Sequence, residues 1–479
     1  MVQKLDKNTI RWCLVGATAL DFIIVLVSAI ALDLQLDYGL RKTMERGNVV
    51  LVSRTFAYLT IKEYMPGLLD KVIDYVRTLS TQYKDAMDSS KADDAEEIIS
   101  KLCMLKDEIL TNQSLRKIND TADDNEMWNK LIENTPILAI NETEPTWLTV
   151  AWLHCQCYMY RRIIEVLLVS KFHTTLDPYR QQKSDAFQSS IEAMQVLAGY
   201  LSNFKSIEDE SKLYESFEVL LEYSLWSNKC DLSILVEEKE GEQVEENDKQ
   251  VKSSEEQNNL KANIISNHTD EVWAYLNCMR LSNEKSIITF VLDNAGFELF
   301  SDLCLADFLL TFKFCTEVHF HVKCIPWFVS DTTAKDFFWT IEQCVNSTDK
   351  NVSNLGKKWV GYLDDNLLVI IEEKFWTSAY DYSMLEQEAP SLYSKLSKSK
   401  LIMFKGDLNY RKLVGDLNWP YTTDIKEASS GFFPAPWCTL RTLKADIVVG
   451  LDPGVSEELD RSVDTWMNSG DYGVVQCCI

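Results

Sequence analysis

The sequence lacks the short motifs that mark several common enzyme classes and metal-binding classes. It has no CxxC pair, so a structural zinc site of the usual cysteine spacing is not expected. GxGxxG is missing and only 16 of the 479 residues are glycine, which argues against a dinucleotide-type loop for a nucleotide or S-adenosylmethionine. GxxxxGK and DxD are also missing, so P-loop kinases and aspartyl-phosphatases lack their signatures here.

Positive charge is scarce. The chain has 48 Lys and Arg against 73 Asp and Glu, a formal net charge of −25, while its content of 46% hydrophobic and 25% charged residues is ordinary for a globular protein. An acidic surface repels phosphate backbones, so no nucleic-acid partner is expected. A small anionic substrate would need a local cationic site or a bound metal ion. The 13 scattered cysteines favour a reducing compartment, and hence a cytoplasmic location.

The N-terminus carries the one long hydrophobic run. Residues 12–32 contain a single charge, Asp21, and follow three basic residues, a pattern typical of a membrane anchor. A carboxylate near mid-span opposes insertion, however. We expect residues 1–45 to be a leader or a dispensable extension, with membrane association through residues 12–32 as the alternative. Nothing in the sequence indicates an oligomeric state.

The periodicity of apolar residues changes along the chain. Residues 46–236 repeat apolar positions at helical spacing, which predicts a helical bundle domain. Residues 237–260 are rich in Glu and Lys and predict a flexible acidic insertion. Residues 261–479 alternate short apolar runs with helical stretches, which predicts an α/β/α sandwich with a mostly parallel sheet.

Five apolar runs are the expected strands of that sheet. They are residues 286–292, 318–325, 367–371, 401–404 and 447–451, with helices expected over 297–314 and 332–344. In open α/β sheets the ligand crevice lies at the carboxyl ends of the strands, so functional residues are expected just after each run.

Polar residues cluster at these expected strand ends. Asp293 and Asn294 follow the first run, and Asp331 follows the second. Oxygen ligands of this kind suit Mg²⁺ or Mn²⁺ rather than Zn²⁺. The segment Asp407, Leu408, Asn409, Tyr410 and Arg411 follows the fourth run, and RTLK, which ends in Lys444, precedes the fifth. A divalent metal beside cationic side chains is typical equipment for binding a phosphoryl group. At a single strand end, polar residues of this kind are more simply interpreted as an ordinary turn or helix cap. Four such strand ends at one edge of the sheet favour a binding site.

These motifs resemble the damage-control phosphatase family. The stretches DNAGFELFSDLCLADFLL, PWFVSD, FKGDLNYRKL and RTLK occur in that order, and RTxK resembles its sugar-phosphate phosphatase subfamily, also known as acidic-residue (protein-glutamate) methyltransferases. The resemblance implies a metal-dependent phosphatase with a helical domain packed on an α/β/α sandwich. It implies Asp293, Asn294 and Asp331 as metal ligands and catalytic residues. It also implies residues 407–411 and Lys444 as binders of the substrate phosphate.

We therefore expect a hydrolase for small phosphometabolites such as fructose 1-phosphate or fructose 6-phosphate. Its metal would be Mn²⁺ or Mg²⁺, with Ni²⁺ or Co²⁺ as substitutes, and it would use no nucleotide cofactor. The nucleophile stays open between a metal-bound water and a strand-tip carboxylate. The alternatives are an S-adenosylmethionine-dependent protein-glutamate O-methyltransferase and a non-enzymatic acidic scaffold.

Two further patterns are weaker. The run from His154 to Arg161 matches the cysteine-phosphatase pattern HCx₅R, but bulky residues fill its interior, so a core helix is expected. His319 and His321 alternate on an expected strand, where packing in the sheet is the simpler interpretation than metal binding.

Overall fold

The computed structural model describes residues 56–135, 144–202, 209–227, 260–280, 285–463 and 465–479. The expected apolar segment 12–32 and nearly all of the expected acidic insertion lie outside these ranges. No helix within them is long and apolar enough to cross a bilayer.

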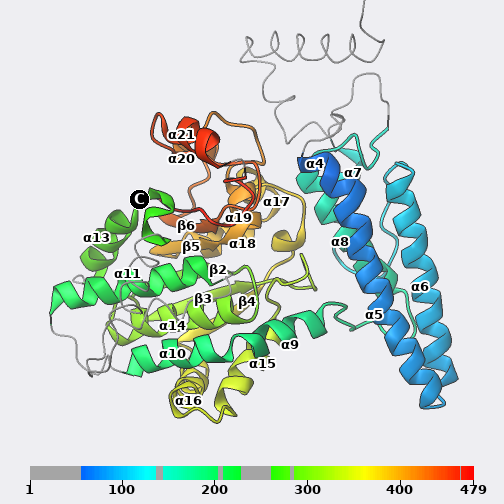
Figure 1. Cartoon of the computed structure of the whole chain (residues 1–479), viewed down its shortest axis with the longest axis horizontal. Helices are drawn as coiled ribbons and strands as arrows, with labels where there is room; N and C mark the ends of the chain where they lie inside the picture. The colour runs from blue at the N-terminus through cyan, green and yellow to red at the C-terminus, as the bar shows by residue number, and fades with distance from the viewer. Residues whose placement is uncertain (1–55, 136–143, 203–208, 228–259, 281–284, 464) are drawn as a thin grey trace, which may run out of the picture. The chain divides into compact units, whose positions relative to one another are not determined.

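A seven-stranded sheet forms the centre of the fold (Figure 1). Its strands are β1 (Ile264–Asn267), β2 (Ile287–Val291), β3 (Glu317–Val322), β4 (Leu368–Glu372), β5 (Leu401–Lys405), β6 (Trp437–Thr442) and β7 (Gly473–Cys478). The spatial order is β1-β7-β6-β5-β2-β3-β4. All neighbouring pairs are parallel except β6 and β7, which confirms the expected mixed α/β fold with a mostly parallel sheet.

The central strands are buried on both faces. All five residues of β5 are buried. Leu401 and Met403 belong to one hydrophobic cluster, and Ile402 and Phe404 belong to the other. Side chains alternate along a strand, so the two clusters lie on opposite faces of the sheet and the architecture is a three-layer sandwich.

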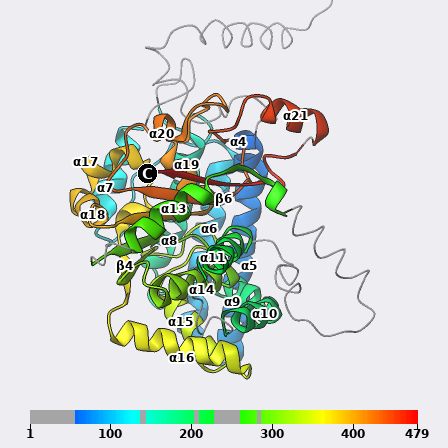
Figure 2. The ribbon, with the colours of Figure 1, turned by 90° about the vertical axis from the view of Figure 1, so that its left-hand side faces the viewer.

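Helices on one face share a cluster with β2 and β3 (Figures 1 and 2). They are α9 (Arg180–Ser189), α10 (Ile191–Ser202), α11 (Glu210–Trp226), α13 (Thr269–Arg280), α14 (Phe297–Thr311), α15 (Ala334–Val345) and α16 (Lys350–Asp364). Helices α10 and α11 lie against α14, so residues that we assigned by periodicity to the helical part also cover the sheet. The expected domain boundaries stay a prediction.

The other face is covered by shorter elements and by the N-terminal helices. The shorter elements are η4 (Lys374–Thr377), η5 (Tyr382–Met384), α17 (Leu385–Glu388), α18 (Pro390–Leu396), α19 (Gly406–Leu413), α20 (Ile425–Ala428) and α21 (Val455–Ser462). The N-terminal helices are α4 (Phe56–Leu59), the π-helical turn η2 (Thr60–Tyr64), α5 (Met65–Asp85), α6 (Ser89–Leu110), α7 (Asn125–Glu133) and α8 (Trp152–Leu168).

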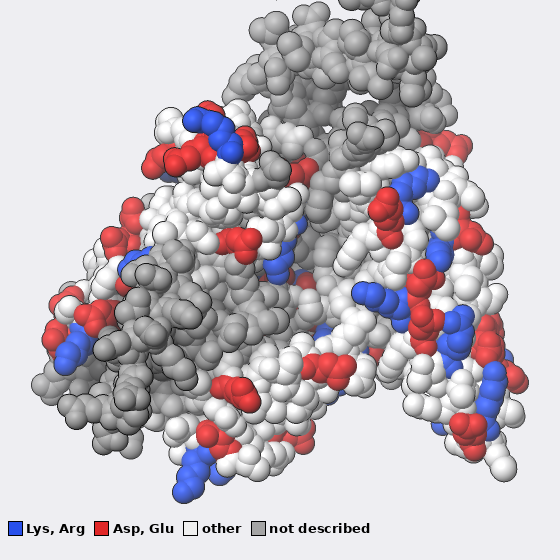
Figure 3. Space-filling view, in the orientation of Figure 1, with Lys and Arg blue, Asp and Glu red and all other residues white. Residues whose placement is uncertain are grey.

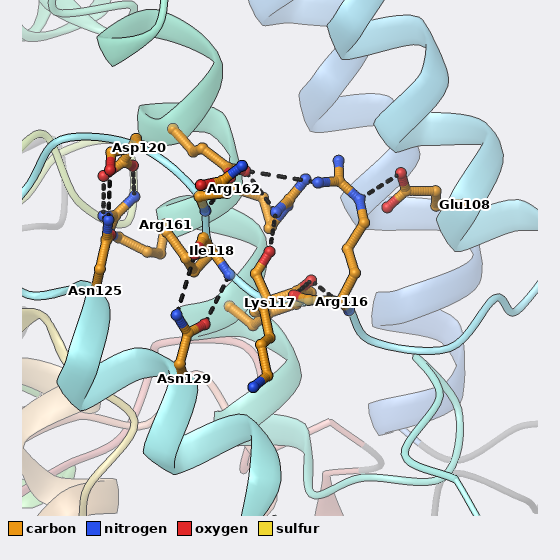
Figure 4. A network of polar contacts seen from close by, with 12 residues as sticks. Glu108, Arg116, Lys117, Ile118, Asp120, Asn125, Asn129, Arg161 and Arg162 are labelled. Atoms are coloured by element: carbon orange, nitrogen blue, oxygen red, sulfur yellow. Dashed lines mark hydrogen bonds and ion pairs between the residues drawn. The ribbon is translucent and has the colours of Figure 1, made fainter.

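Buried ion pairs hold these N-terminal helices together. The guanidinium of Arg161 on α8 is fully buried and lies 2.7 Å from carboxylate oxygens of both Asp120 and Asp124. Figure 4 shows Arg161 reaching Asp120 and Asn125, while Arg116 reaches Glu108 on α6. Because the two carboxylates compensate its charge, Arg161 ties the segment before α7 to the core helix α8.

The outer surface of α5 and α6 carries charges of both signs. Figure 3 shows Lys, Arg, Asp and Glu interleaved along this side. Several are paired, such as Lys106 with Asp70 at 2.7 Å and Lys84 with Glu96 at 2.7 Å. The acidic excess of the chain is therefore not concentrated on these two helices.

One expected strand is wrong. Residues 447–451 are buried but form no strand, and the backbone N–H groups of Gly450 and Leu451 donate to Thr423 and Tyr421 instead. The sheet strand is Trp437–Thr442, which follows β5 in the sheet and contains a buried arginine, Arg441. RTLK therefore spans the end of β6 and does not precede a strand.

The strand order places the ligand crevice. From β2 the chain crosses to β3 and β4 on one side, and then returns to β5 on the other side of β2. The order reverses between β2 and β5, and a topological switch point opens at the carboxyl ends of these two strands. Asp293 and Gly406 follow those ends directly.

Candidate active site

The loops after β2 and β3 are joined by backbone hydrogen bonds. Asn294 and Asp331 form an isolated antiparallel bridge. The N–H of Ala295 donates to Ser330 O at 2.7 Å, and the N–H of Thr332 donates to Asp293 O at 2.8 Å. This pairing brings Asp293, Asn294 and Asp331 together, as the sequence predicted.

Side-chain contacts fix these three residues further. The Asn294 amide nitrogen donates to Asp293 Oδ2 and to Glu298 Oε2, both at 2.8 Å. The Ser330 hydroxyl donates to Asn294 Oδ1. Lys323 Nζ donates to the Leu292 carbonyl at 2.8 Å and lies 3.1 Å from Asp331 Oδ2.

The loop before Asp331 has a strained backbone. Phe328 and Val329 have φ values of 42° and 68°, in the left-handed region that β-branched and bulky residues rarely adopt. The N–H of Ser330 donates to Phe328 O at 2.9 Å. Residues held in such conformations are concentrated at ligand sites, where surrounding contacts maintain them.

Buried negative charge accumulates at these strand ends. Asp293 is 9% exposed and Asp331 is 2% exposed. Burial raises the pKa of Asp293 well above its ordinary value, and the carboxylates of Asp331 and Glu298 raise it further. Burial also raises the pKa of Asp331, although the Lys323 ammonium opposes the rise. A cation among these oxygens would relieve the repulsion.

The donor set fits a hard divalent cation. Two aspartates and an asparagine amide offer oxygen ligands, which Mg²⁺ and Mn²⁺ prefer. Among the residues the structure describes, no group of three or more His, Cys, Asp and Glu side chains is arranged to hold a metal. The amide of Asn294 is therefore a necessary part of this candidate site.

The end of β5 approaches the same carboxylate closely. Gly406 has φ +80°, and a Cβ atom there would lie 1.9 Å from Asp293 Oδ2. Only glycine combines this backbone conformation with that approach. Helix α19 begins at Gly406, so backbone N–H groups of its first turn are not used within the helix.

Asp407 is held by two arginines behind the helix terminus. Arg441 Nε donates to its Oδ1 at 2.7 Å, and Arg411 Nε donates to its Oδ2 at 3.3 Å. Burial would raise the pKa of Asp407, but the charges of Arg441 and Arg411 outweigh burial and leave it below its ordinary value. Asp407 is therefore an ionised hydrogen-bond acceptor.

One pocket of about 960 Å³ collects these elements. Six residues that the sequence predicted line it: Asp293, Asn294, Asp331, Asp407, Leu408 and Lys444. Lys444 is exposed, and its ammonium has no ion-pair partner in the part of the chain that the structure describes. The pocket thus combines buried carboxylates, a helix N-terminus and an available cation.

The chain is similar to known proteins over most of its length. Residues 60–459 match the family described as Damage-control phosphatase ARMT1-like domain. The chain belongs to this family. Proteins named Damage-control phosphatase ARMT1 from Homo sapiens and Bos taurus are each 40% identical over 430 residues, which cover 88% of this chain and 96% of the relative. The relative of that name from Danio rerio is 36% identical over 430 residues, covering 88% and 94%.

Three predicted residues of this ARMT1-like chain do not line the pocket. Asn409 Nδ2 donates to Lys405 O at 2.6 Å and Val291 O at 3.1 Å, so it connects β2 with α19. The Tyr410 hydroxyl accepts from Val449 N at 3.0 Å. Arg411 binds Asp416 and stacks 3.9 Å from the ring centre of Trp152. These side chains support the pocket from behind.

Much of the opposite lining of the pocket could not be predicted from the sequence. This part of the lining comes from the N-terminal helices. Its residues are Leu59, Thr60, Glu63, Tyr64, Trp152, Gln156 and Tyr160. A helical periodicity predicts which residues face a core, but not which distant strand ends they meet. Glu298 was also missed, although it follows Asn294 by one helical turn and binds it.

A buried lysine below the site was missed as well. Lys405 is fully buried, lies 3.0 Å from Asp302 and 3.3 Å from Glu298, and donates to the Ser224 hydroxyl at 2.7 Å. Burial raises the pKa of Asp302 to about 6, against the opposing charge of Lys405. A lysine directly after an apolar run was the available signal, because a buried charge at the end of a strand requires buried partners.

The weaker sequence patterns have structural roles. His154 lies within α8 and its ring is bonded to the Thr135 hydroxyl, which confirms the core-helix interpretation of HCx₅R. His321 Nδ1 accepts from Trp376 Nε1 at 3.1 Å. His319 lies 3.3 Å from Glu317.

Proposed function

We propose that this protein is a divalent-metal-dependent phosphatase that hydrolyses small phosphate monoesters, with hexose phosphates such as fructose 1-phosphate and fructose 6-phosphate as its substrate class. One observation carries the proposal. The buried carboxylates Asp293 and Asp331 face the same pocket as Lys444 and the N-terminus of α19. Opposite charges arranged in this way suit a metal ion and a phosphoryl group together.

Asp293, Asn294 and Asp331 would hold the ion, which when bound would neutralise charge on phosphoryl oxygens. The Lys444 ammonium would attract the remaining phosphoryl oxygens as a mobile point charge. Backbone N–H groups of Gly406 and Asp407 would donate to them at the helix terminus. The ionised carboxylate of Asp407 suits a substrate hydroxyl better than a phosphate, because it can only accept hydrogen bonds.

The experiment is hydrolysis of p-nitrophenyl phosphate and fructose 1-phosphate by the purified protein with a panel of Mg²⁺, Mn²⁺, Co²⁺ and Ni²⁺. EDTA should abolish both activities, and Mn²⁺ should restore them. Asp293→Asn and Asp331→Asn should reduce turnover while circular dichroism stays unchanged. Full activity in chelator, or full activity of both variants, would reject the proposal.

The other interpretations give different results in the same preparations. A protein-glutamate methyltransferase would transfer a labelled methyl group from S-adenosylmethionine, and an acidic scaffold would show neither activity. We also propose a cytoplasmic location, which suits this substrate class. The 11 described cysteines are all free thiols, as a reducing compartment requires.

A further inference from the structure

Gln156 is a buried residue of the candidate active site whose amide nitrogen has no hydrogen-bond partner among the described residues. It lies on α8, is 2% exposed, and lines the pocket together with Asp293 and Asp331. Its side-chain nitrogen is buried and has no partner within the described ranges. A buried polar group without a partner lowers stability, so an amide retained at such a position points to a ligand that completes it.

A second polar group of the same pocket is also available. Glu63 belongs to the π-helical turn η2, is exposed, and lines the pocket beside Thr60 and Tyr64. No hydrogen bond or ion pair of its carboxylate occurs within the described residues. Short π-helical turns are frequent at functional sites. A free carboxylate would repel a phosphate, but it accepts hydrogen bonds from hydroxyls.

Aromatic side chains frame these two polar groups. Burial raises the pKa of the Tyr64 hydroxyl, and the Tyr160 hydroxyl opposes the rise. The ring of Tyr160 stacks on Phe328 with centroids 4.6 Å apart and planes at 25°. Tyr64, Tyr160 and Phe328 all line the pocket, so the π-helical turn, α8 and the strained loop before Asp331 each contribute an aromatic ring to it. Aromatic walls with a few polar groups are typical of sites that bind and orient a small organic molecule.

We infer that Gln156 and Glu63 are specificity-determining residues that bind hydroxyl groups on the carbon skeleton of the phosphorylated substrate. The inference rests on the proposed phosphatase function and extends it to the part of the substrate that is not phosphate. The Gln156 amide can donate or accept, because rotation exchanges its nitrogen and oxygen. Glu63 accepts from a second hydroxyl. A polyhydroxylated phosphate ester satisfies both groups, whereas an aryl phosphate satisfies neither.

The test compares fructose 1-phosphate with p-nitrophenyl phosphate in the full-length, Mn²⁺-loaded protein. Gln156→Met keeps the length of the side chain and removes the amide. The ratio of kcat/KM for fructose 1-phosphate to that for p-nitrophenyl phosphate should fall about tenfold, as expected for one lost hydrogen bond to a buried amide. Glu63→Gln, at an exposed position where folding is not at risk, should lower the same ratio.

Thermal unfolding separates binding from a structural role. Gln156→Met should keep or raise the Tm of the substrate-free protein, since it removes an unpaired polar group. The matched control is Gln476→Met. Gln476 is fully buried, but its amide nitrogen donates to Val449 O at 2.7 Å and Ser266 Oγ at 3.0 Å, so its replacement should lower the Tm.

These measurements test the phosphatase function and the role of the two pocket residues separately. If the wild-type protein hydrolyses neither ester, the proposed function fails. If it hydrolyses both, and the two pocket variants leave the ratio unchanged, the inference fails while the phosphatase function stands. A fall in Tm for Gln156→Met equal to that of Gln476→Met, with an unchanged ratio, would identify Gln156 as a structural residue.

Discussion

At the scale of single residues, the site requires that residue 406 has no Cβ atom. Gly406 and Gly431 have nearly the same backbone conformation, with φ values of +80° and +81°. A Cβ at Gly431 would meet nothing within 4 Å, whereas one at Gly406 would overlap the carboxylate of Asp293. The pair therefore separates backbone strain from loss of space.

Gly406→Ala should reduce kcat/KM by about 100-fold or more, because displacing a catalytic group by about 1 Å has effects of that size. Gly431→Ala should keep its activity and lose about 1–2 kcal/mol of stability through the left-handed backbone alone. Activity assays and urea denaturation check both variants. Equal loss of activity in the two would show that the approach of Gly406 to Asp293 is unimportant.

Among the described residues that line the pocket, Lys444 is the cation that no carboxylate pairs. Lys444→Ala should lower kcat/KM for fructose 1-phosphate by about 10- to 100-fold, the usual effect of removing a hydrogen bond to a charged group. Calorimetry should show Mn²⁺ affinity nearly unchanged. Lys357→Ala, an exposed lysine on α16, is the control and should keep wild-type kinetics. Lost metal binding with intact phosphate binding would reverse the roles that we assign.

At the scale of elements, helix α11 carries a buried carboxyl group. Glu222 is 6% exposed. Burial raises its pKa from 4.5 to about 7, the Glu218 carboxylate adds to the rise, and Lys261 opposes it. Because the pKa is higher in the folded state, the folded protein binds more protons between these two pH values. Glu222 therefore lowers stability as the pH rises through this window.

Glu222→Gln should match the wild type near pH 4 and exceed its unfolding free energy by up to about 3 kcal/mol at pH 8. Urea denaturation at both pH values measures the difference. Glu192→Gln on the neighbouring α10 is exposed and should show no pH-dependent change. A Glu222→Gln protein that is less stable than wild type at pH 8 would contradict this account.

At the scale of the whole molecule, the family match covers residues 60–459. The chain from Gly47 to Ile479 forms one compact unit. We therefore expect the chain from Gly47 onward to fold without the N-terminal apolar segment.

A chain that begins at Gly47 should unfold at the same temperature as the full-length protein and keep its kcat/KM. A chain that begins at Pro66 is the matched control. It loses Ala57, Ile61 and Met65, which are fully buried, and should lose about 2 kcal/mol or more for each large side chain removed. Unfolding of the Gly47 chain would show that the apolar segment belongs to the core.

Much of the sheet could be predicted from the sequence. The runs of β2, β3, β4 and β5 were predicted, and the central strands β2 and β5 are apolar because they are buried on both faces of the sheet. The side chains that follow parallel strands must meet at one edge of the sheet. The sequence therefore predicted that Asp293 and Asp331 lie close together. The resemblance of these ordered motifs to the damage-control phosphatase family was confirmed by the match over residues 60–459.

Only the tertiary structure decided which cations face the pocket and which residues stand opposite. Arg411, Arg441 and Lys444 look alike in sequence, but Asp407 and Asp416 compensate the two arginines and leave Lys444 available. Strand β6 was not predicted, because its buried Arg441 interrupts the apolar pattern. The charge is compensated by Asp407, a partner that the sequence pattern does not reveal. Gln156 and Glu63 lie on helices. The periodicity of a helix predicts which of its faces is buried, but not which distant residues that face meets. Their place in the pocket follows from contacts between residues more than 100 positions apart, which local pattern does not encode.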